Sequence, residues 1–344
     1  MHDLTTGRIL VTGGAGFIGS ALVWALNLRG IDDIVVADIL DRGQKWKNLS
    51  PLRFRDYMDA AELEVCALNS PKKLEDIATV FHLGACSSTT EADAAYLMRN
   101  NFEYTKNLAG WAVSRGVRFL YASSAATYGA LENVLCENRE LRTLRPLNMY
   151  AYSKHFFDCY AQSEGWLEAI TGLKYFNVFG PNEYHKGEMR SLVNKAFDQI
   201  ADGGAVKLFK SHRVEYADGE QQRDFLYVKD AVEMTLHLAA IPQATGLFNV
   251  GSGYAHTWLD LIRPIFQAMQ RPVDIEFIDM PPALRAQYQY STCASLQRLR
   301  NTGYTQGATQ LAAAVTDYVS NYLMVGGHLD PMDEVGSPRA MVNW

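Results

Sequence analysis

The sequence predicts a doubly wound α/β fold, in which helices cover both faces of a parallel β-sheet and a smaller mixed α/β lobe is added to it. Three observations predict this fold. Short β-branched and apolar runs alternate with helical stretches, a glycine-rich loop follows the first of these runs, and the pattern changes after Gly180 and Pro181. Buried parallel strands are near-continuous apolar runs connected by helices, so this alternation indicates a parallel sheet.

The elements follow in chain order from the periodicity of the apolar residues. Runs such as Ile-Leu-Val after Arg8 and Ile-Val-Val after Asp33 are short and rich in β-branched residues, as in strands. We expect strands at 8–12, 33–37, 79–83, 118–122, 173–176 and 246–250. Apolar residues recur at helical spacing in other stretches. We expect helices there, at 20–28, 96–115, 153–163, 188–201, 258–270 and 308–323.

The change of pattern divides the chain into two parts. Residues 1–176 with 224–251 are expected to form the nucleotide-binding domain. Residues 177–223 with 252–325 are expected to form a smaller lobe that closes over the carboxyl edge of the sheet and binds the substrate. Residues 326–344 are rich in Gly, Pro and Asp without periodicity, which predicts a flexible tail.

Composition and charge exclude several classes of function. The 344 residues include 38 acidic and 32 basic side chains, for a net charge of −6, which argues against a nucleic-acid or anionic-membrane surface. No apolar run approaches the ~20 residues of a membrane helix, and the N-terminus lacks a signal-peptide layout. The five cysteines are scattered without a Cys-x-x-Cys pair, as expected of reduced thiols in a cytoplasmic protein with no metal site.

A glycine-rich loop joins the first predicted strand to the first predicted helix. Gly14, Gly16 and Gly19 match the spacing of the dinucleotide-binding fingerprint, and Gly13, Gly16 and Gly19 match its shifted form. Glycine lets the backbone turn tightly and approach a pyrophosphate, which then faces the free N–H groups of the helix N-terminus. Asp38 follows the second strand, where a carboxylate can accept a hydrogen bond from a ribose hydroxyl. A glycine-rich turn without a ligand is the alternative.

The residues after Asp38 bear on the choice between NAD and NADP. A carboxylate at this position suggests NAD. However, Arg42, Lys45 and Lys47 follow and could neutralise the 2′-phosphate of NADP. The alternative for these three residues is a solvated basic loop. The residues alone therefore leave both cofactors open.

A serine, a tyrosine and a lysine form the candidate catalytic set. Ser124 ends a predicted strand, and Tyr150 and Lys154 lie four residues apart on one face of a helix. We expect the lysine charge to lower the tyrosine pKa, so that a phenolate removes the proton of an alcohol while hydride leaves its carbon. The serine hydroxyl would bind the reacting oxygen. Tyr152 has no lysine four residues later and is expected to pack, and Ser123 is expected to be a neighbour or cofactor contact.

These motifs resemble those of the extended short-chain dehydrogenases/reductases that act on nucleotide sugars, and among them those of the ADP-heptose 6-epimerases. Gly-Ala-Cys-Ser-Ser-Thr-Thr-Glu from Gly84 and His-Lys-Gly from His185 are specific to this branch. Stretches 11–19, 121–129, 150–154, 175–181 and 223–228 are shared with the wider family. The resemblance extends from about Arg8 to about Tyr322.

The resemblance implies a Rossmann fold, a bound NADP with NAD as the alternative, and epimerisation of ADP-heptose at C6 for lipopolysaccharide core synthesis. Hydride would leave C6, the 6-keto intermediate would reorient, and hydride would return to its other face. Two acid/base groups suit this reaction, because the epimeric hydroxyls point in different directions; Tyr150 matches one and Lys186 the other. A diphosphate contact is the alternative for Lys186. The resemblance also implies a homo-oligomer, expected to be a pentamer.

Further site residues are implied by the resemblance. The expected cofactor contacts are Gly13, Gly16, Phe17, Ile18, Gly19, Asp38, Ile39, Lys45, Leu83, Gly84, Ala85, Cys86, Ser87, Asn100, Lys154 and Val178. The expected substrate contacts are Ser87, Ser124, Asn177, Glu188, Lys195, Phe209, Arg223 and Tyr288. The alternative for Phe209 and Tyr288 is lobe core. The chain departs from the family pattern where Glu188 replaces a serine, Lys195 a histidine and Ala60 a lysine expected at the cofactor phosphate.

Other functions on the same fold are less consistent with these residues. A nucleotide-sugar dehydratase needs an acid pair after the strand-end hydroxyl, where this chain has Ala125 and Ala126. A UDP-hexose 4-epimerase is an alternative, but it would not need Lys186. A non-catalytic NAD(P)-sensing protein would have no use for Tyr150 and Lys154, which are both present.

Overall fold

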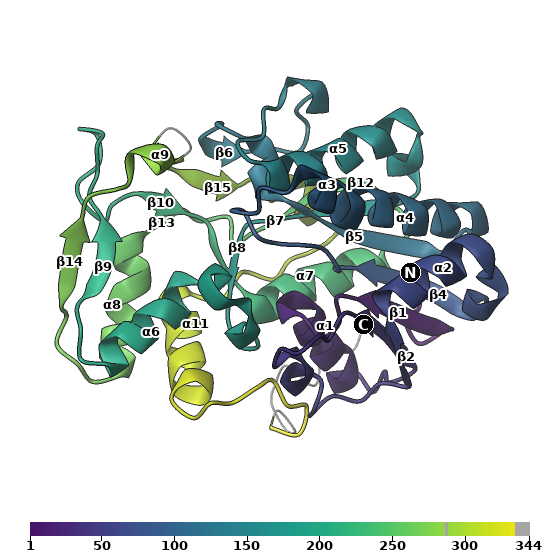
Figure 1. Ribbon diagram of the computed structural model, residues 1–344, viewed down its shortest axis with the longest axis horizontal. Coiled ribbons are helices and arrows are strands. Elements are labelled where there is room, and N and C mark those ends of the chain that lie inside the picture. The colour runs from purple at the N-terminus through teal and green to yellow at the C-terminus, as the bar shows by residue number, and fades with distance from the viewer. Residues whose placement is uncertain (286–287, 334–344) are drawn as a thin grey trace.

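A seven-stranded parallel sheet forms the centre of the part of the chain that the computed structural model describes, residues 1–285 and 288–333 (Figure 1). The strand order is β12-β7-β5-β4-β1-β2-β3. The strands are β1 (Arg8–Thr12), β2 (Ile34–Asp38), β3 (Asp56–Asp59), β4 (Ile77–His82), β5 (Arg118–Ser124), β7 (Thr171–Tyr175) and β12 (Gly246–Val250). Val11 of β1 pairs with Val36 of β2 and Phe81 of β4, so apolar side chains lie side by side in the core.

Helices cover both faces of this sheet. α1 packs against α7 on one face, and α2 packs against α4 on the other, where α5 also lies (Figure 1). Their bounds are α1 (Phe17–Leu28), α2 (Ala60–Asn69), α3 (Ala94–Leu97), α4 (Tyr104–Arg115), α5 (Met149–Ser163) and α7 (Val228–Ala240), with a π-helical turn, Met98–Glu103, between α3 and α4. The predicted doubly wound fold is therefore confirmed.

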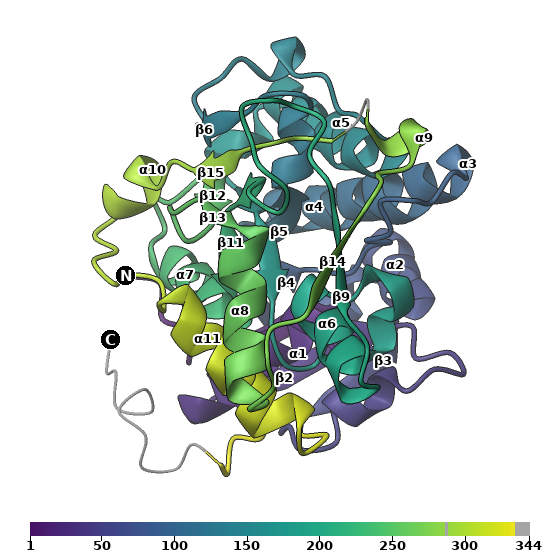
Figure 2. The same cartoon turned by 90° about the vertical axis from the view of Figure 1, so that its left-hand side faces the viewer.

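Smaller elements gather beyond the carboxyl edge of the sheet, where α6, α8 and α11 pack together beside the β9–β14 pair (Figure 2). The strands are β6 (Asn133–Leu135), β8 (Asn177–Phe179), β9 (Val206–Phe209), β10 (Gln222–Arg223), β11 (Phe225–Tyr227), β13 (His256–Thr257), β14 (Ile275–Ile278) and β15 (Thr292–Ala294). The helices are α6 (Leu192–Ala201), α8 (Trp258–Ala268), α9 (Pro282–Arg285), α10 (Gln297–Arg300) and α11 (Leu311–Tyr318), the last followed by a π-helical turn, Val319–Leu323.

The ends of three helices differ from prediction for identifiable reasons. α1 begins at Phe17, directly after the glycine loop, and not at residue 20. α5 begins at Met149 and not at residue 153, because the Asn148 side chain caps it by accepting a hydrogen bond from Ala151 N. α6 begins at Leu192 and not at residue 188, because Arg190 has an extended backbone and the Ser191 side chain caps the helix by accepting a hydrogen bond from Asn194 N.

The sequence patterns missed β3, α2, α7, β9 and β14, and also several elements of two to four residues. β3 is an edge strand of four residues with an aspartate at each end, so it lacks the continuous apolar run by which the other strands were found. β9 and β14 pair across a long stretch of sequence, and periodicity within one segment carries no record of its partner. The six predicted strands are all present, with ends shifted by at most two residues.

The C-terminal segment differs most from its prediction. Leu329 is fully buried, and its backbone N–H donates to Asn182 Oδ1 at 3.0 Å. The predicted flexible tail is therefore wrong for residues 327–331, which pack against the protein, whereas Met332 is 70% exposed. Residues 334–344 of that prediction lie outside the described residues.

Candidate active site

The strand order reverses direction between β1 and β4, and the loops that follow these two strands diverge there. Ligands of open α/β sheets bind at such a switch point, beyond the carboxyl ends of the strands. The glycine loop after β1 and residues 83–87 after β4 form walls of one groove at this point. The sheet topology thus brings together two motifs that are far apart in the sequence.

The glycine loop leaves no room for side chains. A Cβ atom at Gly13 would lie 2.6 Å from Gly84 N, and one at Gly19 would lie 2.1 Å from Gly13 O. Gly16 caps α1 without any side-chain hydrogen bond, and the first-turn residues Phe17, Ile18 and Gly19 line the groove, where helix N-termini have amides without an intrahelical partner. This backbone cradle fits the pyrophosphate of a dinucleotide.

We expect Gly19→Ala to weaken cofactor binding. Its methyl group would overlap the Gly13 carbonyl, and relieving the overlap would displace the loop from the groove. Overpacking typically costs ~1–3 kcal/mol, which corresponds to a loss of about 5- to 150-fold in affinity. Isothermal titration calorimetry with the dinucleotide measures this affinity. Gly307→Ala is the control, because nothing lies within 4 Å of a Cβ there; equal affinities of the two variants would contradict the cradle.

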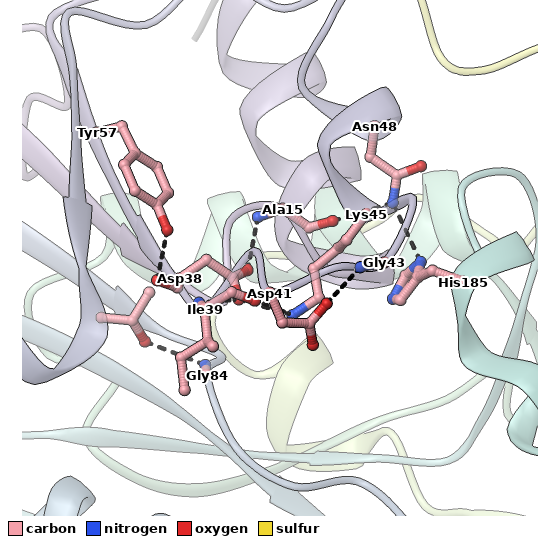
Figure 3. Close-up of polar contacts among 11 residues, drawn as sticks. Ala15, Asp38, Ile39, Asp41, Gly43, Lys45, Asn48, Tyr57, Gly84 and His185 are labelled. Atoms are coloured by element: carbon pink, nitrogen blue, oxygen red, sulfur yellow. Dashed lines mark hydrogen bonds and ion pairs between the residues drawn. The ribbon is translucent and has the colours of Figure 1, made fainter.

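The Asp38 carboxylate lies at the base of this groove, held in place by three donors (Figure 3). The backbone N–H groups of Ala15 and Ile39 donate to it at 2.8 and 2.7 Å. Lys45 Nζ donates to Asp38 Oδ1 at 2.8 Å and to Ile39 O at 3.1 Å. Lys45 lines the groove, whereas Lys47 donates to Gln44 Oε1. Of the three basic residues considered for a 2′-phosphate, Lys45 is thus the one at the cofactor groove.

The part of the groove formed by residues 60–64 carries no basic side chain. Ala60, Ala61 and Glu64 line it, and Glu64 Oε1 accepts a hydrogen bond from Asn107 Nδ2 at 2.8 Å. Asn100 also lines the groove. The replacement of a lysine by Ala60 therefore removes a cation from the groove itself.

Asn101 supports the groove from behind and was not singled out by sequence reasoning. Its side chain accepts from Cys86 N at 2.9 Å and donates to Cys86 O at 3.0 Å and to Ser153 Oγ at 3.0 Å. It lies in the π-helical turn, Met98–Glu103, and such turns are frequent at functional sites. Asn101 therefore ties the loop after β4 to α5, which carries the tyrosine and lysine.

Ser124, Tyr150 and Lys154 line one cavity next to this groove. Burial raises the pKa of Tyr150, and its hydrogen bond with Ser124 opposes that shift. Burial lowers the pKa of Lys154 to about 8, and Lys154 Nζ donates to Ala122 O at 2.8 Å. The net result of these two effects is a Tyr150 pKa above its ordinary value, with burial as the largest cause.

Tyr152 lies outside the cavity lined by this set, whereas Ser123 lines the same cavity. Tyr152 is 44% exposed and stacks on Phe156, with ring centroids 5.7 Å apart. Ser123 is buried and its hydroxyl donates to Asp158 Oδ2 at 2.8 Å. Asp158 also accepts from buried Lys174 at 2.8 Å, beneath the catalytic cavity. Sequence reasoning missed this ion pair, although a lysine inside an otherwise apolar strand was a visible signal.

Lys186 lies where the cofactor groove, the catalytic cavity and the outer substrate pocket meet, and it lines all three. Its ammonium lies 5.1 Å from the centroid of the Phe17 ring. Burial lowers the pKa of Lys186, and the nearby Glu183 carboxylate opposes this shift. A lysine with a lowered pKa can exchange protons at neutral pH, so this position suits an acid/base group.

The outer pocket lies between the sheet edge and the smaller elements. The candidate substrate residues that line it are Asn177, Glu188, Lys195, Phe209 and Tyr288. Phe209 and Tyr288 are half-buried in its wall, not sealed in a core. Arg223, Ser87 and Ser124 line the adjoining catalytic cavity. The Arg223 guanidinium lies 4.9 Å from the centroid of the Tyr288 ring, and the Tyr288 hydroxyl accepts from Trp258 Nε1 at 2.9 Å.

Every candidate site residue lines a part of this cleft. The candidate cofactor residues line the groove or the adjoining catalytic cavity: Gly13, Gly16, Phe17, Ile18, Gly19, Asp38, Ile39, Lys45, Leu83, Gly84, Ala85, Cys86, Ser87, Asn100, Lys154 and Val178. Lys186 adjoins both groove and outer pocket, so the parts are continuous. The cleft can therefore hold a dinucleotide at one end and an elongated anionic ligand at the other.

Comparison with known proteins agrees with this geometry. Residues 9–251 match the sequence profile of the NAD dependent epimerase/dehydratase family. The chain belongs to this family. It is 49% identical over 315 residues to an ADP-L-glycero-D-manno-heptose-6-epimerase of Nitratidesulfovibrio vulgaris (strain DP4), covering 91% of this chain and 97% of that protein.

Solved structures of two epimerases have a similar architecture. The crystal structure of Helicobacter pylori ADP-L-glycero-D-manno-heptose-6-epimerase superposes with a TM-score of 0.76 at 27% identity, covering 93% of this chain and 98% of that one. A Thermus thermophilus UDP-glucose 4-epimerase in complex with NAD gives 0.71 at 25% identity, covering 91% and 97%. The family and the glycine cradle identify a nicotinamide dinucleotide as the cofactor.

Two general features of the described residues bear on membranes and metals. Within residues 1–285 and 288–333, no helix is both long and apolar enough to cross a bilayer. The same residues contain no cluster of three or more histidine, cysteine or acidic side chains arranged to bind a metal ion.

Proposed function

We propose that this protein interconverts ADP-D-glycero-β-D-manno-heptose and ADP-L-glycero-β-D-manno-heptose by oxidation and re-reduction at C6, with NADP as its cofactor. The observation that carries the proposal is the convergence of Tyr150 and Lys186 on one cavity beside the cofactor groove. Two separate proton-transfer groups suit a reaction that must handle hydroxyls on both faces of one carbon. The similarity to enzymes named for this activity supports the choice of substrate. The product would serve lipopolysaccharide core synthesis.

The proposed mechanism assigns a role to each residue. The nicotinamide ring, when bound, supplies a hydride acceptor and donor. Tyr150 or Lys186 removes the proton of the 6-hydroxyl as hydride leaves C6, and Ser124 hydrogen-bonds the carbonyl oxygen that forms. Lys154, one helical turn from Tyr150, keeps a positive charge near neutral pH and favours the phenolate. After the 6-keto group reorients, the other acid/base residue returns a proton while hydride adds to the opposite face.

The outer pocket accounts for the remainder of the substrate. Arg223 can bind the diphosphate in a bidentate manner, and its guanidinium is already oriented by Tyr288. Phe209 and Tyr288 can pack against the adenine. Lys195, whose ammonium donates to Glu188 O at 3.1 Å, adds positive charge to this end. Residues 177–223 with 252–325 thus act as the substrate-binding lobe, and residues 1–176 with 224–251 as the NADP-binding domain.

The preference for NADP rests on Lys45. We expect Lys45→Ala to lower the affinity for NADP by about 10- to 100-fold, the value of a charge-assisted hydrogen bond, and to affect NAD less. Without the ammonium, the buried Asp38 carboxylate would also repel a 2′-phosphate. Titration with both dinucleotides measures the preference. Lys47→Ala is the matched control, since Lys47 donates to Gln44; equal losses for NAD and NADP in Lys45→Ala would contradict the assignment.

The experiment that tests the function is proton NMR of ADP-D-glycero-D-manno-heptose incubated with the purified protein, without added cofactor. We expect signals of the L-glycero epimer to appear, which would establish substrate, reaction and a self-recycling bound cofactor together. An unchanged spectrum, also after addition of NADP and NAD, would refute the proposal. UDP-hexoses in parallel incubations test the 4-epimerase alternative.

A further inference from the structure

The loop that carries Lys186 is held by residues from beyond α11. After α11, the chain runs from the smaller lobe back to α1, as the yellow segment in Figure 1 shows. We call residues 326–331 of this segment the C-terminal strap. Leu329 of the strap is fully buried in the main hydrophobic core, and Pro331 is also buried. The strap is therefore a packed element and not a loose end.

Asn182 is the first point of attachment. Its carbonyl oxygen accepts from Asn48 Nδ2, its side-chain amide donates to Ser20 Oγ on α1, and its Oδ1 accepts from Leu329 N of the strap, each at 3.0 Å. Asn182 has a positive φ of 75°, a conformation that non-glycine residues rarely adopt. Such a conformation persists only where the surroundings hold it, and here the strap is one of the three holders.

Tyr184 is the second point of attachment. Its hydroxyl lies 2.9 Å from Gly327 O and 3.2 Å from Tyr322 O, as a donor to these carbonyls. Its ring contacts that of His328, with centroids 5.2 Å apart. Lys186 follows two residues later, and its backbone N–H donates to Glu183 O at 3.0 Å. The strap thus contacts the two residues that set the direction of the chain into Lys186.

We propose that the C-terminal strap positions Lys186 for proton transfer by holding the loop at Asn182 and Tyr184 against α1. The inference rests on the proposed function for the chemical role of Lys186. It makes Leu329 and Tyr184 positioning residues, since neither side chain lines the cleft at the reacting atoms. Misplacement of an acid/base group by about 1 Å can cost up to roughly 100-fold in rate.

Two variants of the strap test this inference. Leu329→Glu places a charge at a fully buried position and should release the strap, whereas Met332→Glu places the same charge at a neighbouring position that is 70% exposed. We expect Leu329→Glu to raise hydrogen exchange of residues 182–190, to increase labelling of Lys186 by an amine-reactive reagent, and to lower kcat by about 10- to 100-fold with little change in KM. Met332→Glu should match the wild type in all three.

Tyr184→Phe keeps the inference testable if Leu329→Glu fails to fold. It removes only the hydroxyl, and we expect kcat to fall by about 2- to 10-fold, the value of one hydrogen bond, with faster exchange in the same loop. Exchange and labelling are measured without substrate, so they report on the strap even if ADP-heptose is not converted by the wild type. Exchange in residues 182–190 that is equal in Leu329→Glu and Met332→Glu would overturn the inference, as would faster exchange with unchanged kcat.

Discussion

Tyr150→Phe is expected to lower the rate of epimerisation by about 10²- to 10⁴-fold, the contribution of a positioned general acid/base. Phenylalanine preserves the ring at the start of α5 and removes only the hydroxyl that hydrogen-bonds with Ser124. The substrate proton then has no acceptor on that side of the cavity. Conversion of ADP-heptose followed by NMR measures the rate, and circular dichroism and cofactor content check that the fold and the groove are intact.

Tyr152→Phe is the matched control for this prediction. It makes the same chemical change two residues away, at a tyrosine that is 44% exposed and stacks on Phe156. We expect its turnover to equal that of the wild type. Undiminished turnover in a correctly folded Tyr150→Phe variant would contradict the proposed mechanism. An equal loss of turnover in Tyr152→Phe would show that the effect is not specific to the cavity.

Lys186→Met should have the second largest effect. Methionine fills the volume next to Phe17 but cannot accept or return a proton. If Lys186 is the second acid/base group, kcat should fall by about 10²- to 10⁴-fold while KM changes little, because the lost interaction exists only in the transition state. If it is a diphosphate contact, KM should rise while kcat is kept.

Steady-state kinetics of ADP-heptose conversion separate these two outcomes. Lys210→Met is the control, since its ammonium pairs with Asp279 at 3.4 Å, on the carboxyl side of β14. Wild-type kcat in Lys186→Met would eliminate the mechanism with two bases and leave Tyr150 as the single acid/base residue. The lowered pKa of Lys186 also predicts that its neutral amine is available at a lower pH than for an exposed lysine.

The cofactor loop and the catalytic set could be predicted from the sequence because both are local patterns. Glycines at the spacing of Gly13, Gly16 and Gly19, placed between a strand and a helix, indicate a tight turn. A spacing of four residues places Tyr150 and Lys154 on one helical face. The position of Lys186 at the junction of groove and pocket agrees with its predicted role, but that prediction came from resemblance and not from its local pattern.

Other features depend on contacts between distant segments. Burial raises the pKa of Tyr150, and the effect follows from how much water the folded cavity excludes. The ion pair between Asp158 and Lys174 forms only when α5 packs on the sheet. The local sequence around Leu329 is typical of an unstructured tail, and its burial depends on contacts with the core and with Asn182.

The sequence by itself determined the fold class and the nucleotide loop and predicted the catalytic set of Ser124, Tyr150 and Lys154, since each depends on backbone geometry or side-chain chemistry within a short segment. Only the tertiary structure decided the electrostatic environment of those groups, the pairing of β9 with β14 and the path of the C-terminal strap. Desolvation and long-range packing are properties of the assembled chain, and they arise from neighbours that the order of residues along one segment does not reveal.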